Sequence, residues 1–138
     1  MTENQQAIES VVQAFVGALN AKDAAALAAL FTDDAEFVTI FGTRMRGRAE
    51  IESGHARVLS GALAGTRAFA GPMESKLLAP NVALCHARWT RERLPDAAEG
   101  SLPPGAGIFT IVLVHEATRW AVAALTNVQD APPPPLKK

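Results

Sequence analysis

Cysteine is almost absent from this chain, since Cys85 is the only one among 138 residues. A framework of disulfides within the chain is therefore excluded, and the composition favours a reducing compartment such as the cytoplasm. Cys85 lies in an apolar run, where a thiol usually forms an inert part of the core; a reactive thiol is the alternative.

Charge of one sign and long apolar runs are also missing. The formal net charge is −1, without clusters of like charges, so we expect no binding to nucleic acid or to a membrane surface. No apolar stretch approaches the roughly 20 residues of a membrane span. The N-terminal residues MTENQQ lack the basic segment of a signal peptide. These observations predict a cytoplasmic protein.

Length and composition fit one compact domain. At 138 residues, with 49% hydrophobic and 20% charged residues, the chain can bury roughly two-thirds of its unfolded surface. We place the domain at residues 1–130. The proline-rich segment 131–138 cannot pair in a sheet, and we expect a flexible tail there.

Hydrophobic periodicity predicts helices first and strands afterwards, the order typical of an α+β protein. Asp23 is a suitable N-cap between the first two helices, and Pro72 indicates an edge strand or a bulge. Asp33 and Asp34 are expected to serve a turn. The expected helices span about 4–20, 24–31 and 48–63; the strands span 36–41, 44–46, 66–79, 82–93, 107–116 and 120–129; a turn lies at 32–34 and a loop at 94–105.

Three stretches carry a resemblance to a known family. They are NQQAIESVVQAFVGALNAKDAAALAALFTDDAEFVTIFG at 4–42, FGTRMRGRAEIESGH at 41–55, and APNVALCHARW at 79–89 followed by IVLVH at 111–115. The chain resembles the SgcJ/EcaC-type branch of the NTF2-like superfamily, close to the DUF4440 and SnoaL-like groups. Met45 departs from the tryptophan usual in that branch.

The resemblance implies a cone-shaped roll, in which three N-terminal helices pack on a curved, mainly antiparallel sheet. It also implies a small-molecule pocket between helices and sheet, and a homodimer through the open sheet face. Members occur in bacterial secondary-metabolite clusters and carry a generic oxidoreductase label.

Ketosteroid isomerases, which share this fold, use a carboxylate base with a tyrosine and a protonated aspartate as donors. When the chain is laid on that pattern, the tyrosine position falls on Phe15, the base on Thr39 and the aspartate near Thr110. A phenyl ring cannot donate a hydrogen bond, and an unactivated threonine is not a useful base. Isomerase activity of that type is therefore disfavoured.

His55 is the candidate catalytic residue, because its helical spacing from Ile51 and Val58 turns it inward and burial favours the neutral base. A core histidine bonded to a backbone carbonyl is the alternative. Asn127 is the candidate polar ligand-binding residue, although a backbone or water partner would equally satisfy its amide. The remaining candidate ligand-binding residues are Phe15, Phe37, Thr39, Phe41 and Trp89.

No metal or cofactor is expected. The histidines are scattered over separate elements, and the GAG at 105–107 follows prolines and opens a strand instead of a helix. Arg44, Arg46 and Arg48 are interpreted as solvated charges, with an anion clamp as the alternative.

The sequence thus predicts an NTF2-like protein that binds a small apolar, ring-containing metabolite. A cofactor-independent cyclase, dehydratase or isomerase of secondary metabolism is the leading hypothesis. The alternative is a non-catalytic ligand-binding module or a dimeric assembly module.

Overall fold

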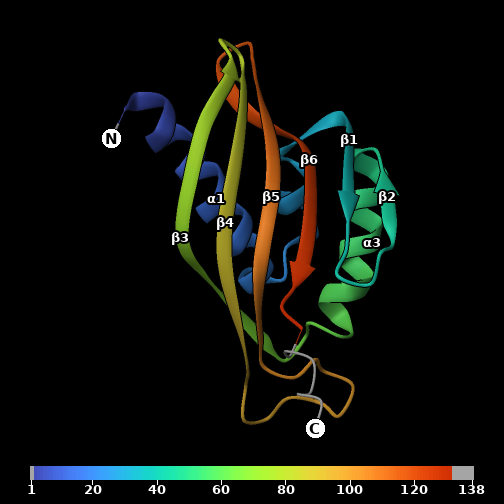
Figure 1. Cartoon of the computed structure of the whole chain (residues 1–138). Helices are drawn as coiled ribbons and strands as arrows, with labels where there is room; N and C mark the ends of the chain where they lie inside the picture. The colour runs from blue at the N-terminus through green and yellow to red at the C-terminus, as the bar shows by residue number, and fades with distance from the viewer. Residues whose placement is uncertain (1, 132–138) are drawn as a thin grey trace, which may run out of the picture.

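The structure is a computed structural model that describes residues 2–131 (Figure 1). The predicted tail at 131–138 lies almost wholly outside the described residues. The helices of residues 2–131 cover one face of a six-stranded sheet with the strand order β2-β1-β6-β5-β4-β3. The elements are α1 (Glu3–Ala21), α2 (Ala24–Ala28), β1 (Phe31–Val38), β2 (Arg44–Arg46), α3 (Arg48–Ser60), β3 (Thr66–Ala79), β4 (Val82–Arg93), β5 (Gly105–Glu116) and β6 (Arg119–Gln129).

Local side chains set the ends of the first two helices. Thr2 and Gln5 form a capping box at the start of α1. Lys22 ends that helix in the left-handed conformation, at φ 57°. The Asp23 side chain then accepts a hydrogen bond from the backbone of Ala26, which confirms the predicted N-cap of α2.

The long strands β3 to β6 form an antiparallel meander, and β1 joins β6 in the parallel direction. Pro72 lies on the edge strand β3, where the register shifts between Ala70 and Met73. Both expectations for this proline are therefore met. The absence of its N–H matters little at this position, because an edge strand has one unpaired side and a bulge interrupts the ladder.

The expected turn at 32–34 is wrong. Phe31 and Thr32 are buried at 0% and 5% exposure and open β1, so α2 also ends earlier than expected, at Ala28. A register shift between Phe31 and Glu36 accommodates the two aspartates inside the strand. Asp33 pairs with Arg48, and Asp34 accepts a hydrogen bond from Thr32. Pairing of β1 with β6 thus overrides the turn preference of Asp-Asp.

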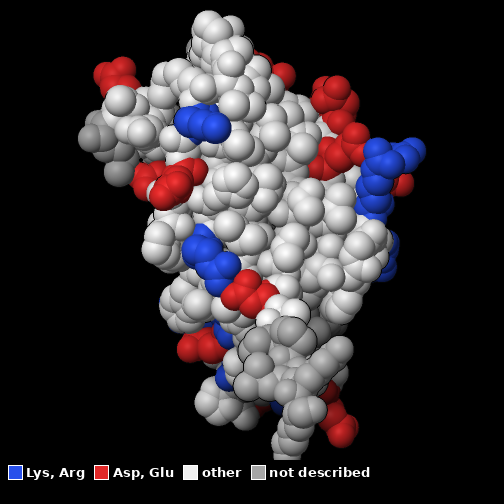
Figure 2. All heavy atoms as spheres, viewed as in Figure 1, with Lys and Arg blue, Asp and Glu red and all other residues white. Residues whose placement is uncertain are grey.

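The two faces of the sheet differ in burial. On β4, Ala83, Cys85, Ala87 and Trp89 face the helices and are buried, because successive side chains of a strand point to opposite faces of the sheet. The opposite face is viewed in Figure 2, where charged side chains are sparse over the central strands. Among residues 2–131, no helix has the length and apolarity needed to cross a membrane.

Candidate functional site

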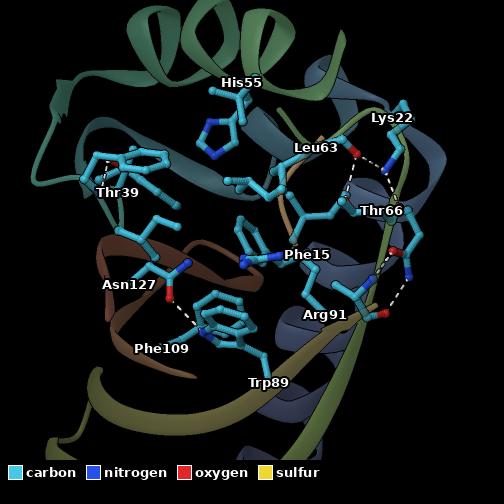
Figure 3. Close-up of a pocket in the computed structure, with 18 of the residues that line it drawn as sticks. Phe15, Lys22, Thr39, His55, Leu63, Thr66, Trp89, Arg91, Phe109 and Asn127 are labelled. Carbon is cyan, nitrogen blue, oxygen red and sulfur yellow. Dashed lines mark hydrogen bonds between the residues drawn. The ribbon is translucent and has the colours of Figure 1, made fainter. Parts of the chain in front are cut away.

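A cavity of about 100 Å³ lies between the helices and the concave face of the sheet (Figure 3). Its walls come from α1, α3, all six strands and several of the segments that connect these elements. The lining residues are Phe15, Leu19, Asn20, Lys22, Phe37, Thr39, Ile40, Phe41, Met45, His55, Val58, Leu63, Thr66, Ala68, Trp89, Arg91, Leu102, Phe109 and Asn127.

Aromatic rings form much of the wall. Phe15 stands at their centre, with its ring centroid 5.4 Å from that of Phe109 and 6.1 Å from that of Phe37. Trp89 continues the series at 6.0 Å from Phe109. These separations are those of favourable aromatic pairs, so the wall is preorganised as a surface for a ring.

His55 projects from α3 into this aromatic cavity (Figure 3). The residue is 4% exposed, and its Nδ1 lies 2.7 Å from the carbonyl oxygen of Ile51. A carbonyl only accepts, so Nδ1 carries a proton. Burial lowers the pKa of the imidazole, partly offset by this hydrogen bond. In the neutral ring Nε2 is therefore an unprotonated acceptor, and among residues 2–131 the hydrogen bond of this ring is made by Nδ1 alone.

The backbone-bonded histidine considered from the sequence is thus present, and it leaves Nε2 available. The ring centroid of Phe37 lies 4.6 Å from that of His55, at an interplanar angle of 86°. This packing and the bond to Ile51 together hold the imidazole in one orientation, which a base acting on a bound ligand requires.

Asn127 has a side-chain partner that the sequence interpretation did not name. Trp89 Nε1 donates to Asn127 Oδ1 at 2.7 Å. Because an indole N–H is only a donor, the amide oxygen must face it, and the Nδ2 atom is turned toward the cavity (Figure 3). A Cβ on Gly107 would lie 2.4 Å from Trp89 Cζ2 and 2.3 Å from the carbonyl oxygen of Val128, so only glycine fits beneath the indole.

Two basic side chains also line the cavity. Lys22 Nζ donates to the carbonyl oxygens of Leu63 and Thr66, both at 2.8 Å. Arg91 is 7% exposed, and its guanidinium carbon lies 5.4 Å from the Trp89 ring centroid. Burial lowers the pKa of both basic groups.

All seven predicted site residues border the same cavity. Two of them occupy positions that differ from those expected. β1 ends at Val38, so Thr39 begins a turn, where its hydroxyl accepts hydrogen bonds from the backbone of Phe41 and Thr43. Phe41, expected to lie in the strand 36–41, falls outside β1 and is 69% exposed at the rim.

Thr110, the position matched to the second isomerase acid, lies on the other side of the sheet, because burial on β5 alternates with Phe109 and Ile111 inward. Arg44, Arg46 and Arg48 do not line the cavity. Arg44 pairs with Glu36 at 2.5 Å, and Arg48 pairs with Asp33, so the anion clamp among these arginines is not supported.

The sequence interpretation missed Lys22, Arg91 and Phe109. Extending the alternation of β4 by two residues beyond Trp89 would have identified Arg91. Phe109 follows similarly from the alternation of β5. Lys22 had no such signal, because its position depends on the left-handed C-cap of α1 and on contacts with Leu63 and Thr66.

The cavity lacks the groups of a ketosteroid isomerase. No lining residue is aspartate or glutamate, and the chain contains no tyrosine. The titratable lining residues are Lys22, His55 and Arg91, so His55 Nε2 is the group suited to accept a proton near neutral pH. Among the described residues, no group of three or more His, Cys, Asp or Glu could hold a metal ion.

Three helices packed on a curved six-stranded sheet around a cavity define the NTF2-like, or cystatin-like, class of α+β proteins. Within this class, the chain belongs to the SnoaL-like domain family, whose model matches residues 1–126. The comparison with curated proteins finds no match.

Solved structures share the fold at low sequence identity. An uncharacterized protein with a cystatin-like fold from Caulobacter vibrioides is 23% identical, with a TM-score of 0.84 over 95% of this chain and 92% of that one. A candidate aromatic ring hydroxylase from Novosphingobium aromaticivorans is 19% identical, with a TM-score of 0.82 over 94% and 91%. A candidate scytalone dehydratase from the same organism is 16% identical, with a TM-score of 0.78 over 93% and 85%.

Proposed function

We propose that this protein binds a small apolar, ring-containing metabolite in the cavity and rearranges it by proton transfer, without a cofactor. One observation carries the proposal: a neutral imidazole and a fixed carboxamide present Nε2 and Nδ2 to the same aromatic-walled space. The base accepts a proton, and the amide donates to an oxygen. These are the two complementary roles that enolisation of a carbonyl compound needs.

The proposed step uses only groups of this chain. His55 Nε2 takes a proton from a carbon next to a ring carbonyl, and the C–H electron pair moves into the enolate. Asn127 Nδ2 donates a hydrogen bond to the enolate oxygen. The imidazolium then returns the proton to another carbon, which completes an isomerisation, or to a leaving hydroxyl, which departs as water in a dehydration.

The first step of the test is to identify a co-purified ring compound by native mass spectrometry of the purified protein, followed by extraction. This compound is then incubated with the protein in D2O. We expect wild type to incorporate deuterium next to the carbonyl. His55→Gln should lower the rate by about 10²-fold or more, with ligand affinity changed only a few-fold. His115→Gln, at the exposed end of β5 and outside the cavity, is the matched control. Undiminished exchange in His55→Gln would refute the assignment of the base.

The alternative is a binding module without catalysis. Its support is that burial lowers the pKa of His55, which makes the imidazole a weaker base, and that no acid lines the cavity to share the proton. A ligand that binds wild type tightly but gains no deuterium would favour this alternative.

We also propose a cytoplasmic homodimer formed through the outer sheet face. Apolar side chains there align across strands: Leu84 pairs with Val112, and Ile108 pairs with Val128. Figure 2 shows the sparse charge of this face, which a second copy would cover. Light scattering should give a dimer, and Val112→Glu should give a monomer. A wild-type monomer at micromolar concentration would contradict the proposal.

The resemblance of residues 41–55 and 79–89 supports a finer placement, in the SgcJ/EcaC-type branch close to DUF4440 and in secondary metabolism. Neighbouring genes test this placement. A biosynthetic cluster around the gene is expected, and isolated housekeeping neighbours would count against it.

A further inference from the structure

The charged side chains that line the cavity are all of positive sign. Lys22 and Arg91 are its basic residues, and no acidic residue accompanies them. Among residues 2–131 neither forms an ion pair, since the ion pairs there belong to Arg44, Arg48 and Arg88. Met1 and residues 132–138 contain no aspartate or glutamate either. The protein therefore supplies no side-chain carboxylate to neutralise the cavity.

Arg91 is the more deeply buried of the two. Its Nε donates to the carbonyl oxygen of Pro103 at 2.9 Å, and its Nη2 donates to Gln129 Oε1 at 2.7 Å. Both acceptors are neutral. A guanidinium has five N–H donors, and the other three, on Nη1 and Nη2, have no partner among the described residues.

A buried arginine without a counter-ion is unusual, because arginine is rarely buried unless it is paired. The Trp89 ring under the guanidinium offsets part of the cost, but an aromatic face leaves the end of the guanidinium fork unpaired. That end has the geometry that binds a carboxylate through two parallel hydrogen bonds. The unpaired donors and the missing acid point to an anion supplied by the ligand.

We propose that the ligand of the cavity is a small ring compound bearing a carboxylate, and that Arg91 binds this carboxylate while Lys22 adds to the positive field. The inference rests on the proposed function and names its substrate class. The unprotonated Nε2 of His55 would repel a carboxylate, so the ligand is oriented with its acid toward Arg91. The two residues approach the cavity from different sides (Figure 3).

The cavity volume limits the ring system. A closed apolar cavity of roughly 150 Å³ holds one benzene, and this cavity measures about 100 Å³ and opens at a rim near the exposed Phe41. The cavity therefore takes at most one ring, and further substituents extend through the rim. Single-ring carboxylates are consequently the suitable probes.

Benzoate and benzamide test the inference, since they have nearly the same shape and differ in charge. We expect calorimetry or ligand-detected NMR at neutral pH to show benzoate binding wild type about tenfold or more tightly than benzamide. Added salt should weaken benzoate and leave benzamide nearly unchanged. This comparison needs only the wild-type protein, so it does not depend on a variant that folds.

Variants then assign the preference to one residue. Arg91→Gln should bring benzoate to the affinity of benzamide, and Arg91→Lys, which keeps charge without the fork, should retain part of the difference. Arg88→Gln is the matched control, because Arg88 lies on the same strand and pairs with Asp130 outside the cavity.

The outcomes separate the two proposals. Equal binding of both probes to wild type, or a preference that survives in Arg91→Gln, would overturn the carboxylate inference and leave the ligand-binding function standing. Failure of both probes to bind would count against the inference and against single-ring binding in this cavity together. Loss of the preference in Arg88→Gln would assign the effect to general surface charge and refute the role of Arg91.

Discussion

Replacing His55 with glutamine should remove a defined pH dependence of stability. His55 is 4% exposed, and burial lowers its pKa in the folded protein. The ordinary value of about 6.5 applies in the unfolded chain. Between the two values the unfolded chain binds a proton that the folded protein does not. The free energy of unfolding therefore falls as pH drops below about 6.5, and levels off beneath the folded-state pKa.

The titration of a single group limits how steeply the free energy of unfolding can change with pH. A single protonation difference changes the free energy of unfolding by at most about 1.4 kcal/mol per pH unit. The hydrogen bond from Nδ1 to Ile51 survives protonation and raises the pKa, so it reduces the total. Asp130, whose pKa is lowered by its hydrogen bond to Arg88, acts near and below its ordinary value of 3.8. It does not contribute in the histidine range.

Urea unfolding from about pH 5.5 to 7.5, one unit either side of the histidine reference, measures the slope. The free energy of unfolding of wild type should fall toward pH 5.5. That of His55→Gln should not change with pH, because glutamine does not titrate. His115→Gln changes an exposed histidine at the end of β5 and should keep the wild-type slope. If His55→Gln retains that slope, or wild type has none, the assigned burial and protonation of His55 are wrong.

Three further predictions concern the packing around the cavity. Trp89→Phe and Asn127→Leu should show a coupling energy of about 1 kcal/mol in a double-mutant cycle of urea unfolding, because each removes one partner of the same hydrogen bond; strictly additive effects would contradict that bond. Gly107→Ala should lower the free energy of unfolding by ~1–3 kcal/mol through overpacking, whereas Gly17→Ala, in open space within α1, should raise it by about 0.5–1 kcal/mol; equal effects would refute the clash. Burial raises the pKa of the Cys85 thiol to about 11, so a disulfide reagent at mildly alkaline pH should label it only in denaturant, and rapid labelling of the native protein would be inconsistent with its burial.

Periodicity sufficed to predict most of the helices and strands, and the family resemblance supplied their arrangement. The strands at 66–79 and 82–93 were predicted at their observed bounds, since long antiparallel strands alternate clearly and end at Pro80-Asn81. β1 was placed five residues late. Its start depends on a parallel neighbour, β6, that is distant in sequence, and local preference favoured a turn at Asp33-Asp34.

The residues of the candidate site differ in the same way: local spacing places some of them, and contacts with distant strands decide the others. His55 and Trp89 could be placed inward from spacing on one helix and one strand. The orientation of Asn127 could not, because it depends on an indole from another strand, whose N–H decides which end of the amide faces the cavity. Phe41 was misplaced because the strand before it ends three residues early, at Val38.

Arg91 shows how the alternation of a strand determines the ligand chemistry of the cavity. A sequence pattern assigns arginine to the surface, and on β4 the alternation that buries Trp89 must also bury Arg91 two residues later. In the folded protein the hydrogen-bond acceptors of Arg91 are neutral, and none of them is a carboxylate among residues 2–131. A neutral base at His55 and an unpaired cation at Arg91 give the cavity two unlike ends. A ligand with a removable proton at one end and a negative charge at the other would satisfy both, and no group of the described protein does so.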